Sequence, residues 1–230
     1  MTHQTPVVRP LVMLRGVRMF DRAVRRVIDP LLEIPARRLA ASNVSANTIT
    51  VIGFVFGTLA CAAIAMGDYG TGLVLILLNR LADGLDGMVA RQRQASDLGG
   101  FLDIVLDLLF YGGIPVSFAI SDPARLLPSI FLVYSFIGTS GSFLAFAVIS
   151  ARRGVTTDSD GKKSFFYSVG LMEGTETIIF FVLFCLFPAY FGLLAWTFAA
   201  LCGITTVLRI LLGMRRFRST VCREAERSER

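Results

Sequence analysis

The sequence predicts an all-α integral membrane protein in which six transmembrane helices follow an N-terminal amphipathic surface helix. Three observations lead to this fold class. Of the 230 residues, 54% are hydrophobic and only 17% are charged, whereas about 25% are charged in an average soluble protein. The hydrophobic residues gather in runs close to the roughly 20 residues that a spanning helix needs. The basic residues flank these runs, as they do at the cytoplasmic face of a membrane.

The N-terminal stretch mixes apolar positions with arginines. It cannot cross a bilayer, but it can lie along the surface with its arginines at the lipid phosphates. We predict a basic, amphipathic segment over 1–42, a six-helix transmembrane catalytic domain over 43–215, and a basic cytoplasmic tail over 216–230. The six predicted spans cover 47–66, 72–91, 98–120, 126–150, 170–187 and 191–212.

The basic residues also predict the orientation in the membrane. The connections 67–71, 121–125 and 188–190 contain one basic residue, Arg125, whereas nearly all other lysines and arginines lie on the opposite side. By the positive-inside rule, both termini are expected in the cytoplasm. Lysine is far rarer than arginine, and this preference is typical of a GC-rich bacterial genome. We therefore expect a multi-pass protein of a bacterial inner (plasma) membrane.

The remaining composition excludes several functional classes. The net charge of +6 comes from residues that flank apolar runs, so membrane lipids are the expected partners and nucleic acid is not. The four cysteines form no C-x-x-C pair, which indicates neither a disulfide framework nor a zinc site. The only histidine, His3, lies near the N-terminus, where it is poorly placed for imidazole catalysis.

Four aspartates interrupt the second and third apolar runs at helical spacing. Asp83 and Asp86 are three residues apart, and Asp103 and Asp107 are four apart, so each pair lies on one face of its helix. A short polar turn joins the two runs, and we therefore expect antiparallel neighbouring helices whose carboxylates converge near the cytoplasmic headgroups. Each charged aspartate costs roughly 2.5–3.5 kcal/mol at a helix centre. Oxygen ligands alone favour Mg²⁺ or Mn²⁺ over zinc as the ion that offsets this cost.

Arginines and glycines surround these carboxylates. Arg80 is predicted to face either the site or a structural partner, and Arg209 is predicted to extend toward the headgroups. Salt bridges to these two arginines are the alternative to a metal site, but two arginines cannot neutralise four carboxylates. Arg91, at the cytoplasmic end of the same helix as Asp83, is placed to meet a phosphate. Glycines remove side chains where a ligand must approach closely, and four of them lie here, Gly84, Gly87, Gly99 and Gly100. The pattern indicates a site for an anionic, phosphate-bearing lipid.

The string D-x2-D-G-x2-A-R-x7-G-x3-D-x3-D, read from Asp83 to Asp107, closely resembles the signature of the class I CDP-alcohol phosphatidyltransferases. Many members have eight residues between the arginine and the following glycine, and this chain has one fewer. A second match is Asn47-Thr-Ile-Thr50, which is similar to the N-x-x-T of the family. The resemblance extends over about 40–215 through the six-helix pattern.

The resemblance implies a metal-dependent transferase of phospholipid biosynthesis. Such an enzyme moves a phosphatidyl group from CDP-diacylglycerol to the hydroxyl of an acceptor alcohol and releases CMP. It further implies that Asp83, Asp86 and Asp103 hold Mg²⁺ or Mn²⁺, that Asp107 both joins them and acts as general base, and that the protein is a homodimer. The residues expected to bind the CDP-lipid are Asn47, Thr50, Gly87, Ala90, Arg91, Ser96 and Gly99.

The acceptor and two competing functions stay open at this point. Lys163, Glu173 and Glu176 lie in an unusually polar stretch and are predicted to contact the acceptor, unless the acids only favour the start of a helix. Glycerol 3-phosphate, serine, inositol phosphate and phosphatidylglycerol are all used by similar enzymes. An intramembrane prenyltransferase would also bind Mg²⁺-pyrophosphate through aspartates. A divalent-cation transporter would use the carboxylates for conduction, although their position near one surface argues against it.

Overall fold

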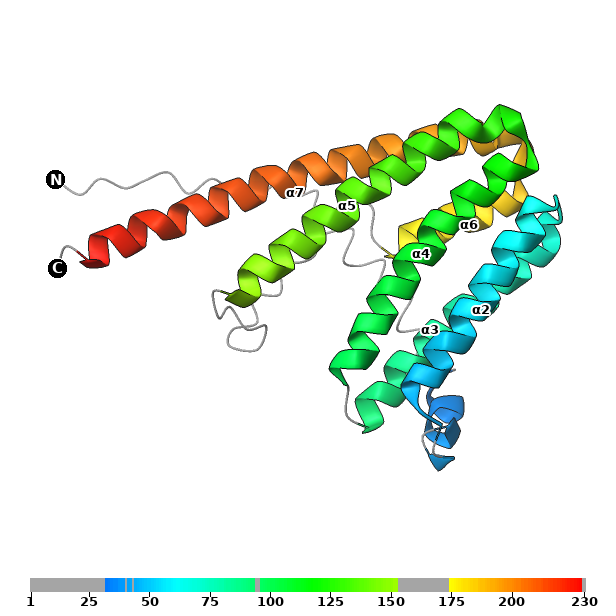
Figure 1. Cartoon of the computed structure of the whole chain (residues 1–230), viewed down its shortest axis with the longest axis horizontal. Helices are drawn as coiled ribbons and strands as arrows, with labels where there is room; N and C mark the ends of the chain where they lie inside the picture. The colour runs from blue at the N-terminus through cyan, green and yellow to red at the C-terminus, as the bar shows by residue number, and fades with distance from the viewer. Residues whose placement is uncertain (1–31, 40, 43, 94–95, 153–173, 229–230) are drawn as a thin grey trace.

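The computed structural model describes residues 32–39, 41–42, 44–93, 96–152 and 174–228. Helices make up nearly all of this part, and it contains no strand. One short helix covers 32–39. Six longer helices follow (Figure 1): α2 (Ala46–Ala65), α3 (Tyr69–Arg93), α4 (Asp97–Ser121), α5 (Leu126–Arg152), α6 (Gly174–Leu186) and α7 (Phe191–Ser228).

Each of the six helices overlaps one predicted span, which confirms the all-helical fold class. Four of the described helices are long and apolar enough to cross a membrane: α2, α4, α5 with the turn before it, and the first part of α7. Helices α3 and α6 are not among these four. Helix α3 carries several charged residues, including Arg80, Asp83 and Asp86, and α6 has only 13 described residues. The number of spans, six, and the orientation in the membrane therefore stay predictions. The N-terminal amphipathic segment also stays a prediction, because residues 1–31 lie outside the described part.

One helix is longer than predicted. Helix α7 has 38 residues and continues to Ser228, whereas the sequence predicts an end at residue 212 and a separate tail. The continuation has a physical reason, because no proline follows Leu212 and arginine and glutamate, both good helix formers, are frequent there. The basic tail is therefore a direct extension of the last helix.

Polar side chains determine where the helices begin. The backbone amide of Thr48 donates to Ser45 Oγ at 3.1 Å at the start of α2, and that of Gly99 donates to Ser96 Oγ at 3.1 Å at the start of α4. Asp68 precedes α3 and accepts from Thr71 at 3.0 Å. Hydrogen bonds from the side chain and the backbone amide of Thr71 lower the pKa of Asp68 below its usual value. The carboxylate therefore stays charged beside the positive end of the helix dipole.

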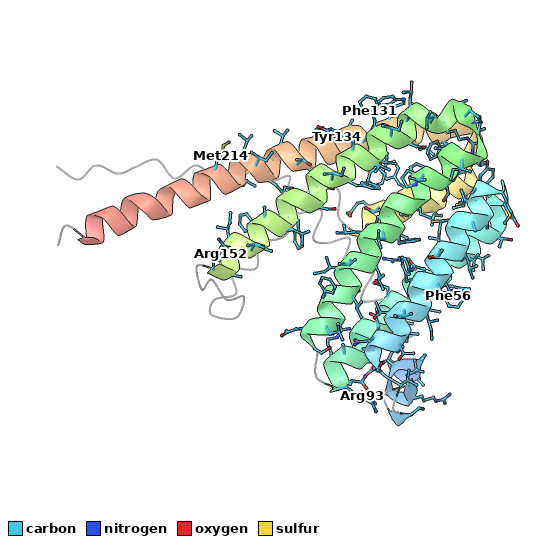
Figure 2. All side chains as sticks on the ribbon, in the orientation of Figure 1. Phe56, Arg93, Phe131, Tyr134, Arg152 and Met214 are labelled. Carbon is cyan, nitrogen blue, oxygen red and sulfur yellow. The ribbon has the colours of Figure 1, made fainter. Side chains whose placement is uncertain are left out.

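Helix α2 packs against both α3 and α4, and α5 runs beside α7 (Figure 1). Glycines make the first contacts close: a Cβ at Gly57 would lie 2.7 Å from the Phe110 ring, and one at Gly53 would lie 3.0 Å from Ala82 Cβ. The core beyond them is aromatic, with ring centroids of Phe118 and Phe191 4.5 Å apart. The outer surface is also largely apolar, and exposed side chains such as Phe131 and Tyr134 of α5 can be seen in Figure 2. This composition suits a bundle surrounded by lipid.

Arg125 ties the helices together at the end of the bundle opposite the aspartates. Its Nη1 donates to the Tyr69 hydroxyl at 2.6 Å, and its guanidinium lies over the rings of Tyr69, Phe118 and Phe191 at 5.3–5.9 Å. These contacts connect the start of α3, the end of α4 and the starts of α5 and α7. Arg125 is thus a half-buried arginine that joins four helices at this end of the bundle.

Candidate metal and nucleotide site

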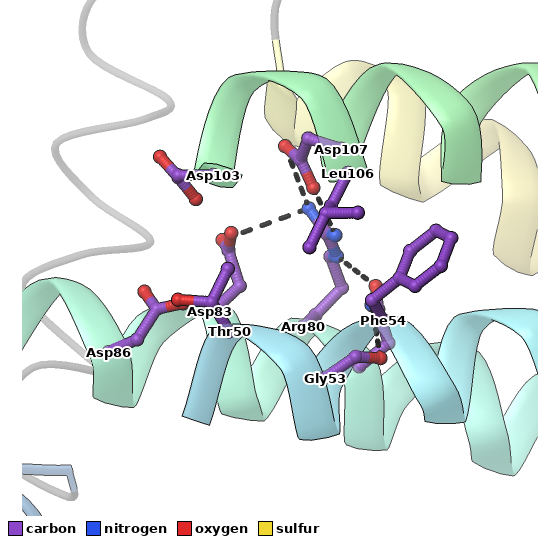
Figure 3. Close-up of a pocket in the computed structure, with 10 residues that line it drawn as sticks. Thr50, Gly53, Phe54, Arg80, Asp83, Asp86, Asp103, Leu106 and Asp107 are labelled. Carbon is purple, nitrogen blue, oxygen red and sulfur yellow. Dashed lines mark hydrogen bonds and ion pairs between the residues drawn. The ribbon is translucent and has the colours of Figure 1, made fainter. Parts of the chain in front are cut away.

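The four aspartates lie where α2, α3 and α4 meet, around a small pocket (Figure 3). Helix α2 contributes Thr50 and Phe54, and it packs against both of the other helices. The sequence predicts α3 and α4 as direct neighbours, but here each of them packs mainly on α2. They face each other through their polar side chains. The pocket measures about 10 Å³, close to the space that one water molecule needs.

Three of the four aspartates converge. One carboxylate oxygen from each of Asp83, Asp86 and Asp103 lies within 4.8 Å of the others. Oxygens on opposite sides of one Mg²⁺ or Ca²⁺ are separated by about 4–5 Å, so the three groups fit a single ion with little movement. The residues lining this pocket include no histidine or cysteine among those that the structure describes. Such a donor set suits a hard cation rather than zinc.

Asp86 provides an independent test of this fit. The residue is 6% exposed, and its Oδ2 is buried without a hydrogen-bond partner among the described residues. A buried carboxylate oxygen without a partner is costly. A divalent cation bound by the three aspartates would remove that cost. The residues present therefore fit a divalent cation.

Asp107 has a different environment from the other three. Arg80 Nη2 lies 2.6 Å from its Oδ1 and Nη1 lies 3.5 Å from its Oδ2, so the guanidinium faces both carboxylate oxygens (Figure 3). Asp107 does not belong to the group of converging oxygens. The sequence leaves open whether Arg80 faces the site or a structural partner. The structure places it in the site.

The residues predicted to bind nucleotide form two small groups beside the aspartates. Asn47 and Gly99 touch across the ends of α2 and α4, since a Cβ at Gly99 would lie 2.8 Å from Asn47 Oδ1. Ser96 is the N-cap of α4 and is next to the same glycine. The Arg91 side chain passes close to Gly87, since a Cβ at Gly87 would lie 3.5 Å from Arg91 Nη1. The remaining predicted residues are Thr50, which lines the pocket, and Ala90, which precedes Arg91 on α3.

Of the three residues predicted to contact the acceptor, only Glu176 lies in the described part. It occupies the first turn of α6. Lys163 and Glu173 fall outside the described residues.

A large cavity adjoins the carboxylates, and the sequence does not predict it. It measures about 670 Å³ and is lined by α4, α5, α6 and α7. Asp103 and Asp107 line it on α4, and Arg209 lines it on α7. Arg209 Nη1 donates to the backbone oxygen of Thr139 at 2.9 Å, so the side chain crosses to α5. Two signals could have indicated this cavity: the polar interruption Gly138-Thr-Ser-Gly141 within the fourth apolar run, and the arginine within the sixth.

Comparison with known proteins shows which family combines these features. The family model described as CDP-alcohol phosphatidyltransferase matches residues 43–210, which include α2 to α6, the first part of α7 and the four aspartates. The chain belongs to this family. The resemblance stated from the signature is thereby confirmed, and the chain is a membrane protein of a family of phospholipid-synthesising transferases.

Individual relatives agree with the family assignment. An inner membrane protein of Escherichia coli (strain K12), YnjF, is 46% identical over 85% of this chain and 95% of its own length. An archaetidylinositol phosphate synthase of Methanothermobacter thermautotrophicus is 36% identical over 50% of this chain and 56% of its own. The crystal structure of a Mycobacterium tuberculosis phosphatidylinositol phosphate synthase with CDP-DAG bound has the same fold. It superposes with a TM-score of 0.59 at 21% identity and covers 80% of this chain and 94% of that one.

Proposed function

We propose that this protein transfers the phosphatidyl group of CDP-diacylglycerol to the hydroxyl of an acceptor alcohol and releases CMP, with Mg²⁺ or Mn²⁺ bound. The observation that carries the proposal is the juxtaposition of two features. Three carboxylates converge, one of which has a buried oxygen without a hydrogen-bond partner among the described residues, and a cavity of about 670 Å³ begins beside them. Asp107 lines both spaces. The related synthase solved with CDP-DAG bound supports the choice of donor.

The residues have distinct roles in this reaction. Asp83, Asp86 and Asp103 would hold the divalent ion, which neutralises charge on the phosphates when it is bound. Arg91 is exposed at the same end of α3 and is suited to a phosphate oxygen. Asn47 and Gly99 accept the nucleotide where the ends of α2 and α4 meet.

Asp107 takes the proton of the acceptor hydroxyl. The hydroxyl oxygen forms a bond to the lipid-linked phosphorus. The bond from that phosphorus to the oxygen of the CMP group breaks, and CMP leaves.

The membrane arrangement is part of the proposal. All six helices cross the membrane, both termini are cytoplasmic, and the site opens to the cytoplasm of a bacterial inner membrane. Arg91 and Arg93 lie at the end of α3 that carries the aspartates, whereas the connection at the other end of the bundle contains Arg125. This asymmetry follows the positive-inside rule. The relative named as an inner membrane protein of Escherichia coli supports the location.

The cavity supports an acceptor that carries both a hydroxyl and a phosphate. Its walls are mostly apolar, and one basic side chain, that of Arg209, is found among its described lining residues. A guanidinium in such surroundings binds a phosphate strongly. Two relatives are named for making inositol-phosphate lipids, which agrees with this chemistry. We therefore propose a phosphate-bearing acceptor and expect free serine to be used poorly.

The test is a transfer assay with purified protein in vesicles. CDP-diacylglycerol and Mn²⁺ are supplied with inositol phosphate, glycerol 3-phosphate, phosphatidylglycerol or serine, and released CMP and new lipids are measured by mass spectrometry. We expect CMP release with at least one phosphate-bearing acceptor and none from the Asp86→Asn variant. Consumption of an isoprenyl pyrophosphate instead would favour a prenyltransferase. Mn²⁺ flux into sealed vesicles without CMP release would favour a transporter.

A further inference from the structure

We propose that the acceptor is a membrane lipid whose headgroup carries a phosphate and a free hydroxyl, and that it enters the large cavity from the bilayer between α4 and α5. The inference rests on the proposed function and narrows it, because a soluble acceptor such as glycerol 3-phosphate carries the same polar groups without an acyl chain. The shape of the cavity, the distribution of its polar side chains and its opening each favour the lipid.

The cavity is elongated along the helices. Its lining runs from Asp103 to Gly112 on α4 and from Val133 to Leu144 on α5, which at 1.5 Å per residue corresponds to about 14–17 Å. Because α4 and α5 are both candidate membrane spans, this length extends into the depth of the bilayer. Its volume of about 670 Å³ is that of a pocket for a drug-sized ligand. A small soluble acceptor fills only part of such a space.

Charged and apolar side chains are separated along this length. The charged ones lie at one end: Asp103 and Asp107 on α4, and Arg209 on α7, which reaches α5 by donating to the backbone oxygen of Thr139 at 2.9 Å. Beyond Asp107, toward the connection between α4 and α5, the described lining of these two helices is uncharged and mostly apolar: Leu108, Tyr111, Gly112, Val133, Phe136 and Ile137. A guanidinium suits a phosphate from either a lipid or a soluble acceptor. The apolar length behind it suits only an acceptor that has a chain, since a polar one would lose its contacts with water there.

The opening of the cavity is also apolar. Helices α4 and α5 are joined through Pro123–Arg125 and diverge from there toward the aspartates (Figure 1). Large apolar side chains from both helices line the cavity and are exposed at the same time, namely Ile104, Leu108, Ile137 and Phe143. The cavity therefore opens between α4 and α5 onto a surface that faces lipid in a membrane. A lipid can bring its headgroup to Asp107 by this route while its chain stays in apolar surroundings.

Two glycines widen the cavity without bringing helices together. A Cβ at Gly112 on α4 or at Gly141 on α5 would meet nothing within 4 Å, and both glycines line the cavity. In this they differ from Gly57, which lets α2 approach the Phe110 ring. Glycine is unfavourable within a helix, and here it leaves room for a ligand. A larger side chain at either position would occupy that room instead.

The first test compares phosphatidylglycerol with its deacylated form, glycerophosphoglycerol, as acceptors for the parent protein in phosphatidylcholine vesicles with CDP-diacylglycerol and Mn²⁺. Both carry the same phosphodiester and terminal glycerol, and only the lipid has acyl chains. Glycerol 3-phosphate and inositol phosphate serve as further soluble acceptors. Phosphatidic acid, which has no free headgroup hydroxyl, replaces phosphatidylglycerol in the vesicles for all soluble acceptors, so that the surface stays anionic.

At equal bulk concentration, we expect CMP release to be faster with phosphatidylglycerol than with each soluble acceptor by on the order of 100-fold, because the lipid is confined to the membrane beside the opening. A soluble acceptor that is used as fast as phosphatidylglycerol overturns the proposal. So does conversion of a soluble acceptor while phosphatidylglycerol is left unused. The proposed function stands in both of these cases. If no acceptor leads to CMP release, the proposed function fails and this inference fails with it.

The second test locates the acyl chain with Gly112→Leu and its matched control, Gly203→Leu. Gly203 on α7 also has nothing within 4 Å of a Cβ, but it is not among the described residues that line the cavity. We expect Gly112→Leu to raise the KM for phosphatidylglycerol about tenfold and to leave the KM for CDP-diacylglycerol unchanged. Gly203→Leu should change neither value.

Gly141→Leu fills the cavity from the opposite wall and should act as Gly112→Leu does. It replaces Gly112→Leu if that variant lowers the thermal midpoint. An unchanged KM for phosphatidylglycerol in both cavity variants overturns the proposal. A KM for CDP-diacylglycerol that rises by as much also overturns it, because the cavity would then hold a chain of the donor.

Discussion

Gly99→Ala is a sharp test of how the nucleotide is bound, because the structure shows what the new methyl group would meet. Its Cβ would lie 2.8 Å from Asn47 Oδ1, whereas ordinary van der Waals contact begins at 3.4 Å. The Asn47 side chain must therefore move by about 0.6 Å. Helix stability does not suffer, since alanine is favoured over glycine within a helix by about 0.5–1 kcal/mol. The neighbouring Gly100 is a matched control, because nothing lies within 4 Å of a Cβ there.

We expect Gly99→Ala to raise the KM for CDP-diacylglycerol about tenfold, the equivalent of one hydrogen bond of about 1.4 kcal/mol. The KM for the acceptor should not change. Gly100→Ala should leave both KM values at the parent level, and neither variant should lower the thermal midpoint. The assay is CMP release with each substrate varied in turn. Equal KM values for CDP-diacylglycerol in the two variants would refute the placement of the nucleotide between Asn47 and Gly99.

Three further predictions follow from the same geometry. Asp86→Asn should raise the thermal midpoint in EDTA, because it removes a buried charge of which one oxygen has no hydrogen-bond partner among the described residues, and should abolish stabilisation by Mn²⁺; a lower midpoint in EDTA would contradict this. Gly57→Val should lower the free energy of unfolding by about 1–3 kcal/mol through overpacking against Phe110, whereas Gly112→Val, with open space around it, should be tolerated in the same denaturation experiment. Arg209→Met should raise the KM for a phosphate-bearing acceptor and leave that for CDP-diacylglycerol unchanged; the opposite pattern would remove Arg209 from the acceptor cavity.

The helices could be predicted because their signals are local. Each apolar run ends at a polar, glycine-containing or proline-containing turn, and the boundaries of α2, α4 and α5 agree within a few residues with the predicted ones. The spacings within the pairs Asp83–Asp86 and Asp103–Asp107 are likewise local, because residues three or four apart share a helix face. The end of α7 could not be predicted from hydropathy, since the helix continues after the apolar residues end.

The division of the aspartates depends on tertiary distances that no spacing reveals. Arg80 is three residues from Asp83 but pairs with Asp107, which is 27 residues away. The choice follows from the hydrogen bond between Asn79 and Gly53, which aims the arginine toward α4. The large cavity is similarly a property of how four helices diverge. Homodimer formation stays a prediction from the family resemblance.

The central claim is that the acceptor hydroxyl attacks the lipid-linked phosphorus of a CDP-lipid. The most direct measurement supplies an acceptor that carries ¹⁸O in its reacting hydroxyl, together with CDP-diacylglycerol and Mn²⁺. Both products are then analysed by mass spectrometry. The account predicts that all the label appears in the phosphodiester of the new lipid and none in CMP. Label in CMP, or a labelled lipid formed without CMP release, would contradict it.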